Sequence, residues 1–461
     1  MTDMTARFAE IVGAHNVLTG DAISEDYAHD EVLTTPPQTP AYLAKPATAD
    51  EVAQLLKNAS DNHVPVTARG SGTGLSGAAI PRADGLLISF ERMNAVLEVD
   101  VTNQVAVVQP GVTLTDLDAA TAGTGLRYMV YPGELSSSVG GNVGTNAGGM
   151  RAVKYGIARH NVLGLQAALP TGELIRTGGK IAKISTGYDL TQLIVGSEGT
   201  LALATEVTVK LHPRLDHSAT VLAPFVDFDQ VMQAVPKILL SGLAPYILEY
   251  VDNVTMAALV HTQNLELGVP DDVRDSCQAY LVVALENRSP DRLDEDVETT
   301  GELLAELGAV DAYVLEGGAA RKLIEAREKA FWTLKALNAD DLIDAVVPRG
   351  AMPKFLSAAR EMAVAAGGAA AGCGHAGDGN VHLAIFCQDP ARRKKLLTDI
   401  FALAMELGGA ISGEHGLGRA KTPYFVELED PVKVDLMRRI KASFDPAGIL
   451  NPDVVFAAGD T

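Results

Sequence analysis

The sequence contains little cysteine and has fewer basic than acidic residues. Its three cysteines, Cys277, Cys373 and Cys387, show no Cys-x-x-Cys spacing. This excludes a four-cysteine iron–sulfur cluster within the chain and favours a reducing compartment. Lys and Arg together number 37 against 58 Asp and Glu, which gives a formal net charge of -21. A surface of this sign repels nucleic acid and anionic lipid, so neither is expected as a partner.

Long hydrophobic runs are also absent. Residues 1–12 lack the continuous apolar stretch of a secretory signal. The longest uncharged run of small residues, 362–376, is too short to span a bilayer. We therefore expect no transmembrane segment and a soluble, cytoplasmic protein.

The composition is otherwise that of a globular enzyme, with 461 residues, 47% of them hydrophobic and 21% charged. That length exceeds what one hydrophobic core usually serves, so we expect more than one domain. In the first half of the chain, short strands, glycine turns and a few helices follow one another closely. In the second half the strands and helices are more widely spaced, which predicts an antiparallel sheet covered by helices. The predicted class is α+β, with domains at 1–217 (core about 38–217) and 218–443, and a tail at 444–461 that packs back on the first domain.

Individual elements can be placed from apolar periodicity and from turn residues. The predicted strands are 86–90, 95–99, 104–109, 219–225, 279–285, 311–315 and 381–386, and the predicted helices are 49–59, 115–122, 291–307 and 319–337.

Two glycine-rich segments in the second half carry metal-type ligands. His375 and His382 bracket one glycine-rich turn, and Glu414-His415 lies in another. Imidazole and carboxylate are ordinary ligands for zinc, iron or manganese. Adjacent residues of an extended loop point to opposite sides, so we expect different roles for Glu414 and His415. Polar side chains in surface turns are the alternative for either segment taken alone.

Three further small-residue segments lie in the first half. The first, Arg69–Gly74, follows a strand as a phosphate loop does, but no helix follows it, so it departs from the Rossmann pattern. The second, 132–149, and the third, 196–201, combine glycines with amide and hydroxyl side chains. Backbone N–H groups in such loops can approach a ligand without obstruction by Cβ. Together the segments predict an extended ligand that carries a pyrophosphate and a planar ring.

These motifs resemble those of flavoproteins whose FAD-binding domain is of the vanillyl-alcohol-oxidase, or PCMH, type. The two histidine segments narrow the resemblance to the group of D-lactate dehydrogenases, D-2-hydroxyglutarate dehydrogenases and the FAD subunit of bacterial glycolate oxidase. It covers nearly the whole chain. The resemblance implies a PCMH-type FAD-binding domain of two α+β subdomains with FAD between them. It also implies an antiparallel-sheet cap domain, covered by helices, that supplies the substrate site.

The resemblance further implies which residues bind FAD, with the first loop holding the pyrophosphate. They are Arg69, Gly70, Ser71, Gly72, Thr73, Gly74, Pro132, Gly133, Ser138, Gly141, Asn142, Thr145, Asn146, Gly148, Gly196, Ser197, Glu198, Gly199, Thr200 and Asn451. Relatives that attach FAD covalently commonly carry a histidine in or near the first loop. This loop has none, so the FAD is expected to bind non-covalently.

In the same group, His375, His382 and Glu414 would hold one divalent metal, and His415 would act as the catalytic base. Zinc is the expected metal, with iron or manganese as alternatives. A metal that binds a 2-hydroxy acid lowers the pKa of its hydroxyl, and a neutral histidine can then remove the proton. Asn380 and Asp378 would either support the metal ligands or form the turn.

Arg327 is the candidate for binding the substrate carboxylate. It lies on the apolar face of the predicted helix 319–337, where a charge needs a partner. The group's carboxylate-binding arginine falls at this place, and the alternative is an internal salt bridge to Asp341 or Asp344. Leu342 stands where the hydroxyglutarate enzymes have a lysine for a second carboxylate, which disfavours a long dicarboxylate substrate.

The function implied is that of an FAD-dependent 2-hydroxy acid dehydrogenase. It would oxidise a small D-2-hydroxy acid, lactate- or glycolate-like, by hydride transfer to flavin N5. Electrons would leave to an external acceptor, which is a quinone, an electron-transfer flavoprotein, a cytochrome or an iron–sulfur subunit. A metal-dependent hydrolase and a non-catalytic FAD electron-relay subunit are the alternatives.

Overall fold

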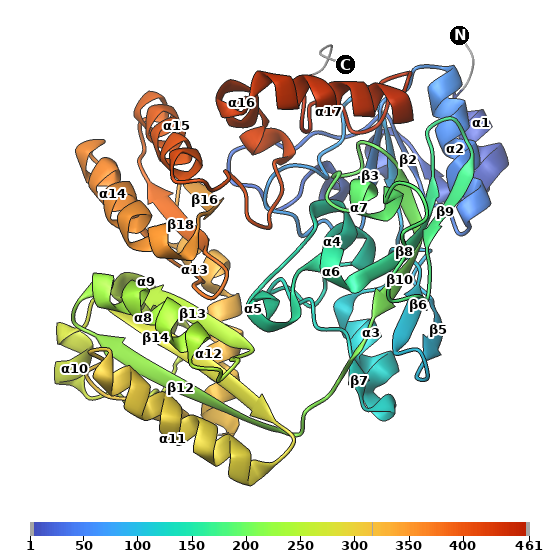
Figure 1. Cartoon of the computed structure of the whole chain (residues 1–461). Coiled ribbons are helices and arrows are strands. Elements are labelled where there is room, and N and C mark those ends of the chain that lie inside the picture. The colour runs from blue at the N-terminus through green and yellow to red at the C-terminus, as the bar shows by residue number, and fades with distance from the viewer. Residues whose placement is uncertain (1–3, 316, 458–461) are drawn as a thin grey trace. The chain divides into compact units, whose positions relative to one another are not determined.

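The computed structural model describes residues 4–315 and 317–457 (Figure 1). By its internal contacts the chain divides into two compact units. Unit 1 consists of Met1–Ala147, Ile157–Arg214 and Glu414–Thr461. Unit 2 consists of Gly148–Gly156 and Leu215–Gly413.

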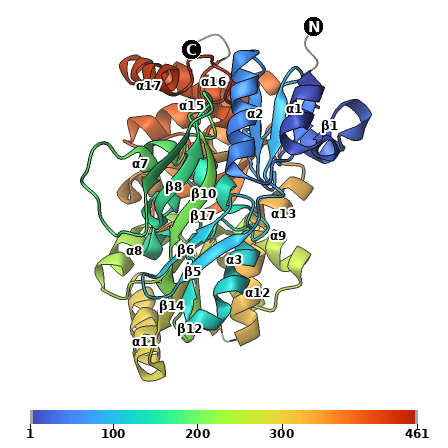
Figure 2. The same ribbon diagram turned by 90° about the vertical axis from the view of Figure 1, so that its right-hand side faces the viewer.

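The first half of unit 1 is a four-stranded sheet of order β1-β2-β4-β3. Its strands are β1 (Val17–Leu18), β2 (Tyr42–Ala44), β3 (Val66–Arg69) and β4 (Leu86–Ser89). β2 and β3 both run parallel to β4. Helices α1 (Met4–Val12) and α2 (Ala49–Asp61) pack against each other, as Figure 2 shows. Phe8, Leu55 and Ile88 belong to one buried cluster, so the apolar faces of both helices and the sheet form a single core.

The second half of unit 1 is an antiparallel five-stranded sheet of order β5-β6-β10-β8-β9. Val108, Leu165 and Val207 on its central strands are buried in a separate core. A small sheet pairs β11 with β7. The elements are β5 (Val96–Asp100), β6 (Val105–Val108), α3 (Leu114–Thr121), β7 (Leu126–Arg127), α4 (Val139–Thr145), α6 (Ala158–Asn161), β8 (Val162–Ala168), β9 (Leu174–Gly178), α7 (Leu190–Ile194), β10 (Leu203–Lys210) and β11 (His212–Pro213).

The C-terminal part of the chain returns to unit 1 at Glu414, earlier than the boundary at residue 444 that the sequence suggested. It contains α16 (Gly418–Leu428) and α17 (Pro431–Phe444). Lys441 of α17 is buried, and its Nζ lies 2.5 Å from Asp445 Oδ2 and 2.8 Å from the carbonyl oxygens of Thr200 and Leu450. A buried ammonium with these three partners fixes α17 to the third glycine loop, and the sequence pattern alone did not reveal this contact.

Unit 2 is built on a seven-stranded antiparallel sheet of order β15-β12-β14-β13-β17-β18-β16. This confirms the α+β class and the antiparallel second sheet expected from the sequence. The strands are β12 (His217–Phe225), β13 (Ile247–Asp252), β14 (Ala279–Asn287), β15 (Tyr313–Leu315), β16 (Asp341–Val346), β17 (Ala369–His375) and β18 (Asn380–Phe386).

Helices cover this sheet. α8 (Phe228–Leu240) and α11 (Pro290–Glu306) pack on β12 and β14, α14 (Met352–Ala365) packs on β17, and α15 (Pro390–Glu406) packs on β16 (Figure 1). α9 (Asn253–Gln263) packs on β13 and β17, and α12 (Gly317–Glu328) and α13 (Ala330–Ala336) pack on α9. α10 (Asp271–Ser276) leads into β14.

Residues 148–156 belong to unit 2, although the sequence analysis placed them in the first domain. They contain α5 (Ala152–Tyr155). Lys154 Nζ forms an ion pair of 2.9 Å with Glu286, Tyr155 donates a hydrogen bond to the same carboxylate, and Val153 lies against Gly377. These contacts with distant residues of unit 2 explain the assignment.

The predicted helix 319–337 is two helices, α12 and α13. The N–H of Lys329 donates to Ala326 O three residues back, so the helical ladder tightens at this point. Both halves keep apolar residues, Leu323 and Ala330, in one buried cluster. Among the helices of residues 4–315 and 317–457, none is both long enough and apolar enough to cross a membrane.

Candidate active site

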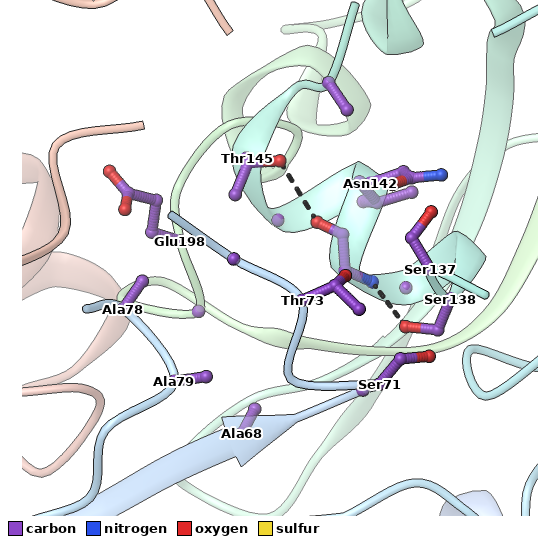
Figure 3. A pocket seen from close by; sticks show the side chains of 18 of the residues that line it. Ala68, Ser71, Thr73, Ala78, Ala79, Ser137, Ser138, Asn142, Thr145 and Glu198 are labelled. Atoms are coloured by element: carbon purple, nitrogen blue, oxygen red, sulfur yellow. Dashed lines mark hydrogen bonds between the residues drawn. The ribbon is translucent and has the colours of Figure 1, made fainter. Parts of the chain in front are cut away.

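A large cavity in unit 1 is lined by the three glycine-rich loops (Figure 3). The space that its lining residues surround is about 1310 Å³, including the part open to solvent. β3 delivers the first loop to the cavity, and α4 lies within the second loop. Ser71 Oγ donates to Ser136 O at 2.6 Å, so the first two loops are in direct contact.

The second loop is partly helical because Ser138 caps α4. Its Oγ accepts a hydrogen bond from Gly141 N at 3.2 Å, and Thr145 Oγ1 donates to Gly141 O at 3.3 Å near the end of the helix (Figure 3). Ser138 and Thr145 therefore shape the cavity wall as well as lining it.

Thirteen of the twenty residues that the sequence assigned to FAD line this cavity. They are Gly70, Ser71, Gly72, Thr73, Gly74, Pro132, Ser138, Gly141, Asn142, Thr145, Ser197, Glu198 and Gly199. The cavity also has lining residues that the sequence analysis did not single out, among them Asp30, Phe90 and Leu203. Glu414 and His415 line the same cavity.

The other seven are Arg69, Gly133, Asn146, Gly148, Gly196, Thr200 and Asn451, and several of them hold the loops in place. Arg69 Nη1 donates to His29 O at 2.5 Å. Asn451 Nδ2 donates to Glu198 O at 2.7 Å and to Ala78 O at 2.9 Å. Gly148 lies in unit 2. Arg69 and Asn451 thus bind backbone carbonyl groups and do not line the cavity, a distinction that sequence motifs do not make.

Glu198 has a role that the sequence analysis missed. Its buried carboxylate accepts the backbone N–H groups of Leu417 and Gly418, each at 2.8 Å. Ser76 Oγ donates to the carbonyl oxygens of His415 and Gly416 at 3.1 Å. The loop that carries Glu414 and His415 is thus fixed to the third glycine loop through Glu198 and to Ser76, which lies just beyond the first.

The environment of Glu198 raises its pKa from 4.5 to about 7. Burial is the main cause, since desolvation disfavours the carboxylate. The N–H groups of Leu417 and Gly418 and the charge of Lys421 oppose that shift. Glu198 therefore changes its protonation state near neutral pH.

Unit 2 contains a second cluster, on one face of its sheet. Val251 on β13 pairs with Cys373 on β17, Cys373 pairs with His382 on β18, and His382 pairs with Asp344 on β16. Residues opposite each other share a face, as do residues two apart on one strand. Four neighbouring strands therefore project Glu249, His375, His382 and Asp344 from the same face.

The two imidazoles face each other with carboxylates behind them. His375 Nε2 and His382 Nε2 are 3.2 Å apart. Glu249 Oε1 lies 2.6 Å from His375 Nδ1, and Asp344 Oδ1 lies 3.6 Å from His382 Nδ1. Both carboxylates are 0% exposed. Asn380 Nδ2 donates to Asp344 Oδ1 at 2.9 Å, so Asn380 supports this cluster, and Asp378 Oδ1 accepts the turn N–H of Asn380 at 3.3 Å.

Arg327 on α12 reaches the same cluster. Its Nη2 lies 2.6 Å from Glu249 Oε2, and its side chain is 8% exposed. Glu249 is thus an acidic partner of Arg327 that was not among the alternatives expected from the sequence, Asp341 and Asp344. Glu249 lies on a strand far from α12 in sequence, and no local pattern connects the two.

Residues 40–178 match the family model of the FAD binding domain, and residues 214–455 match that of the C-terminal domain of FAD linked oxidases. The chain therefore belongs to the FAD-linked oxidase family and is an FAD-linked oxidoreductase. An uncharacterized FAD-linked oxidoreductase of Mycobacterium tuberculosis (strain H37Rv) is 80% identical over 461 residues and covers 100% of both chains.

Relatives with more specific names are more distant. A D-lactate dehydrogenase of Anaerostipes hadrus is 36% identical, covering 98% of this chain and 96% of its own. A glycolate oxidase subunit GlcD of Bacillus subtilis is also 36% identical, covering 99% and 97%. The crystal structure of p-cresol methylhydroxylase superposes with a TM-score of 0.84 at 17% identity, covering 99% of this chain and 97% of that one. The fold is therefore of the PCMH type, as the resemblance implied.

Proposed function

We propose that this oxidoreductase converts a small D-2-hydroxy acid, lactate- or glycolate-like, to the 2-oxo acid. The observation that carries the proposal is the pair of imidazoles in unit 2, with Nε2 atoms 3.2 Å apart and a buried carboxylate behind each ring. The names of the D-lactate dehydrogenase and glycolate oxidase relatives support the substrate class.

This donor set fits a divalent metal. A carboxylate on the Nδ1 side favours the tautomer that leaves a lone pair on Nε2. For His375, whose Nδ1 lies 2.6 Å from Glu249 Oε1, that lone pair faces His382 Nε2 at 3.2 Å, where a cation bound to both nitrogens would replace an N–H···N hydrogen bond. We propose His375 and His382 as ligands and Glu414 as the third. Glu414 directly follows Gly413, whose N–H donates to Asp344 O at 2.9 Å. Two histidines and one carboxylate with an open position are typical of catalytic zinc, and iron or manganese would also accept them.

The cavity of unit 1 fits FAD. The first loop would hold the pyrophosphate, and Ser138, Asn142 and Thr145 would contact the flavin and ribityl parts. FAD, when bound, accepts the hydrogen of substrate C2 together with two electrons. The first loop contains no histidine, so we propose non-covalent binding.

Two side chains act on the substrate. His415 takes the proton of the C2 hydroxyl, because a neutral imidazole is a competent base near neutral pH. The metal, when bound, lowers the pKa of that hydroxyl. Arg327 holds the substrate carboxylate, and its ion pair with Glu249 orients the guanidinium. The hydroxyl proton thus goes to His415, and the C2 hydrogen leaves with the electron pair.

Electrons must then leave the protein. Cys277, Cys373 and Cys387 are each buried and free, so they offer no cluster within the described residues. The acceptor is therefore external: a quinone, an electron-transfer flavoprotein, a cytochrome or an iron–sulfur subunit.

The two alternative functions fare differently. A metal-dependent hydrolase is at odds with membership of the FAD-linked oxidase family. A non-catalytic relay subunit would keep FAD but would not reduce it with substrate.

An anaerobic panel of D- and L-2-hydroxy acids, followed by loss of the absorbance of oxidised flavin, tests the proposal. D-lactate or glycolate should bleach the flavin, and D-2-hydroxyglutarate should act poorly because Leu342 offers no charge to a second carboxylate. A flavin that no 2-hydroxy acid bleaches in the metal-replete protein would indicate the relay function instead.

A further inference from the structure

Glu249 is shared by two functional side chains of unit 2. It lies on the central strand β13 and is 0% exposed. One carboxylate oxygen lies 2.6 Å from His375 Nδ1, and the other lies 2.6 Å from Arg327 Nη2. A buried carboxylate is costly unless it is paired and hydrogen-bonded; here one oxygen is hydrogen-bonded to His375 and the other is in an ion pair with Arg327.

The contact with His375 determines which ring nitrogen carries the proton. An ionised carboxylate only accepts hydrogen bonds, so the imidazole must donate from Nδ1. The neutral ring then has its lone pair on Nε2, the atom that faces His382 Nε2 at 3.2 Å. The tautomer that can bind a metal from this position is therefore the one that Glu249 selects.

The contact with Arg327 restricts the rotation of the Glu249 carboxylate. The guanidinium is cationic, so it holds the facing carboxylate oxygen as the anionic partner of an ion pair. With Oε2 held by Arg327, Oε1 remains directed at His375. Arg327 thus fixes the orientation of the Glu249 carboxylate, which in turn fixes the tautomer of His375.

We infer that Glu249 is a positioning residue: held by Arg327 through one oxygen, it uses the other to keep His375 in the tautomer that binds metal through Nε2. This inference rests on the proposed function, because it takes His375 as a metal ligand.

Glu249→Gln tests the inference because an amide has one accepting and one donating end. If the amide oxygen faces Arg327, the NH₂ group donates to His375 Nδ1, which forces the ring proton onto Nε2. The opposite rotamer sets NH₂ against the guanidinium, donor against donor in a buried site. We expect the zinc affinity of the FAD-loaded variant, measured by competition with a chromogenic chelator, to fall about 10- to 100-fold.

Asp252→Asn is the matched control. Asp252 is a buried carboxylate on the same strand, and it pairs with Arg360 at 3.1 Å. Its residue pairing places it on the other face of the sheet from Val251. The substitution should lower thermal stability and leave zinc affinity unchanged. Equal loss of zinc affinity in both variants would mean that Glu249 acts only through the stability of unit 2, and it would overturn the inference.

A rescue variant separates orientation from stability. In E249Q/R327M no guanidinium constrains the amide, so its oxygen can turn to accept from His375 Nδ1. Zinc affinity should return towards the wild-type value, whereas R327M alone should not raise it. The double variant also removes the buried unpaired charge, so it remains informative if E249Q folds poorly. An E249Q/R327M protein that binds zinc as weakly as E249Q would contradict the inference.

Nitrogen NMR of the metal-free protein, with ¹⁵N-labelled histidine, gives a direct readout. His375 should be protonated on Nδ1 in the wild type and on Nε2 in E249Q. An unchanged tautomer in a folded E249Q protein would overturn the inference. Failure of the proposed function would look different: no 2-hydroxy acid would bleach the flavin, while the differences in zinc affinity between variants would persist.

Discussion

At the scale of single residues, His415 carries the proton transfer in the proposed reaction. Its side chain is 13% exposed, and Nε2 lies 4.0 Å from Glu414 Oε1. The surrounding loop is held by Ser76 and Glu198. A base in a loop with this many anchors is pre-positioned, so its removal should affect rate more than structure.

We expect His415→Asn to keep FAD, metal and near-normal substrate affinity. Its rate of flavin reduction in anaerobic stopped-flow should fall by roughly 10²–10⁴, the usual contribution of a positioned general base. High pH should restore part of the rate, because hydroxide can replace the imidazole. His261→Asn, on the exposed side of α9, is the control and should reduce flavin at the wild-type rate. Reduction within a few-fold of wild type in a metal-replete His415→Asn protein would place the base elsewhere.

Glu198 leads to a prediction about pH and stability. Its pKa is about 7 in the folded protein, against an ordinary value of 4.5. The folded state therefore binds the proton more tightly. The stabilising contribution is complete below pH 4.5 and is lost as the pH rises through about 7.

Denaturant unfolding at pH 5 and pH 8 should show this loss in the wild type, on the order of 3 kcal/mol at most. Glu198→Gln does not titrate, so its free energy of unfolding should decline less over the same interval. Parallel pH dependences in the two proteins would rule out Glu198 as the titrating group.

At the scale of elements, the glycine loops were recognisable from sequence because small residues recur at turns. The order of strands in unit 2 was not recognisable from the sequence. Glu249 and His375 are 126 positions apart, and only the register of β13, β17, β18 and β16 brings the carboxylates to the histidines. The motifs therefore predicted the metal-type ligands, while Glu249 and Asp344 required the sheet.

The first loop depends on backbone conformation at Gly72. Its φ is +74°, and a Cβ there would collide with the Arg69 guanidinium, which donates to His29 O. A side chain at this position would therefore collide with Arg69 within the protein itself. We expect Gly72→Val to displace Arg69 and to lose FAD, measured as flavin content after gel filtration.

Gly125→Val is the matched control for that variant. Gly125 has nearly the same φ, +73°, but its Cβ would meet nothing within 4 Å, and it does not line the cavity. It should show the strain of a β-branched residue at positive φ as a lowered melting temperature, yet retain FAD. Normal flavin content in Gly72→Val would argue against the loop as a cofactor site.

At the scale of the whole molecule, sequence predicted the α+β class and an antiparallel second sheet, but its division at residues 217 and 443 did not include two features of the observed units. Residues 148–156 join unit 2 and the chain re-enters unit 1 at Glu414. The contacts behind both assignments, Lys154 with Glu286 and Lys441 with Thr200, join residues far apart in the chain. Periodicity reports which residues are buried and carries no information on such partners.

The central claim is that FAD and a divalent metal act together on a 2-hydroxy acid. The most direct test is anaerobic flavin bleaching in a single turnover, with D-lactate as substrate. One preparation is measured as purified, after chelation, and after zinc is restored. We predict that D-lactate bleaches the flavin of the purified protein. Chelation should abolish bleaching while the flavin remains bound, and restored zinc should bring bleaching back. Bleaching at an unchanged rate in the metal-free protein would contradict the claim.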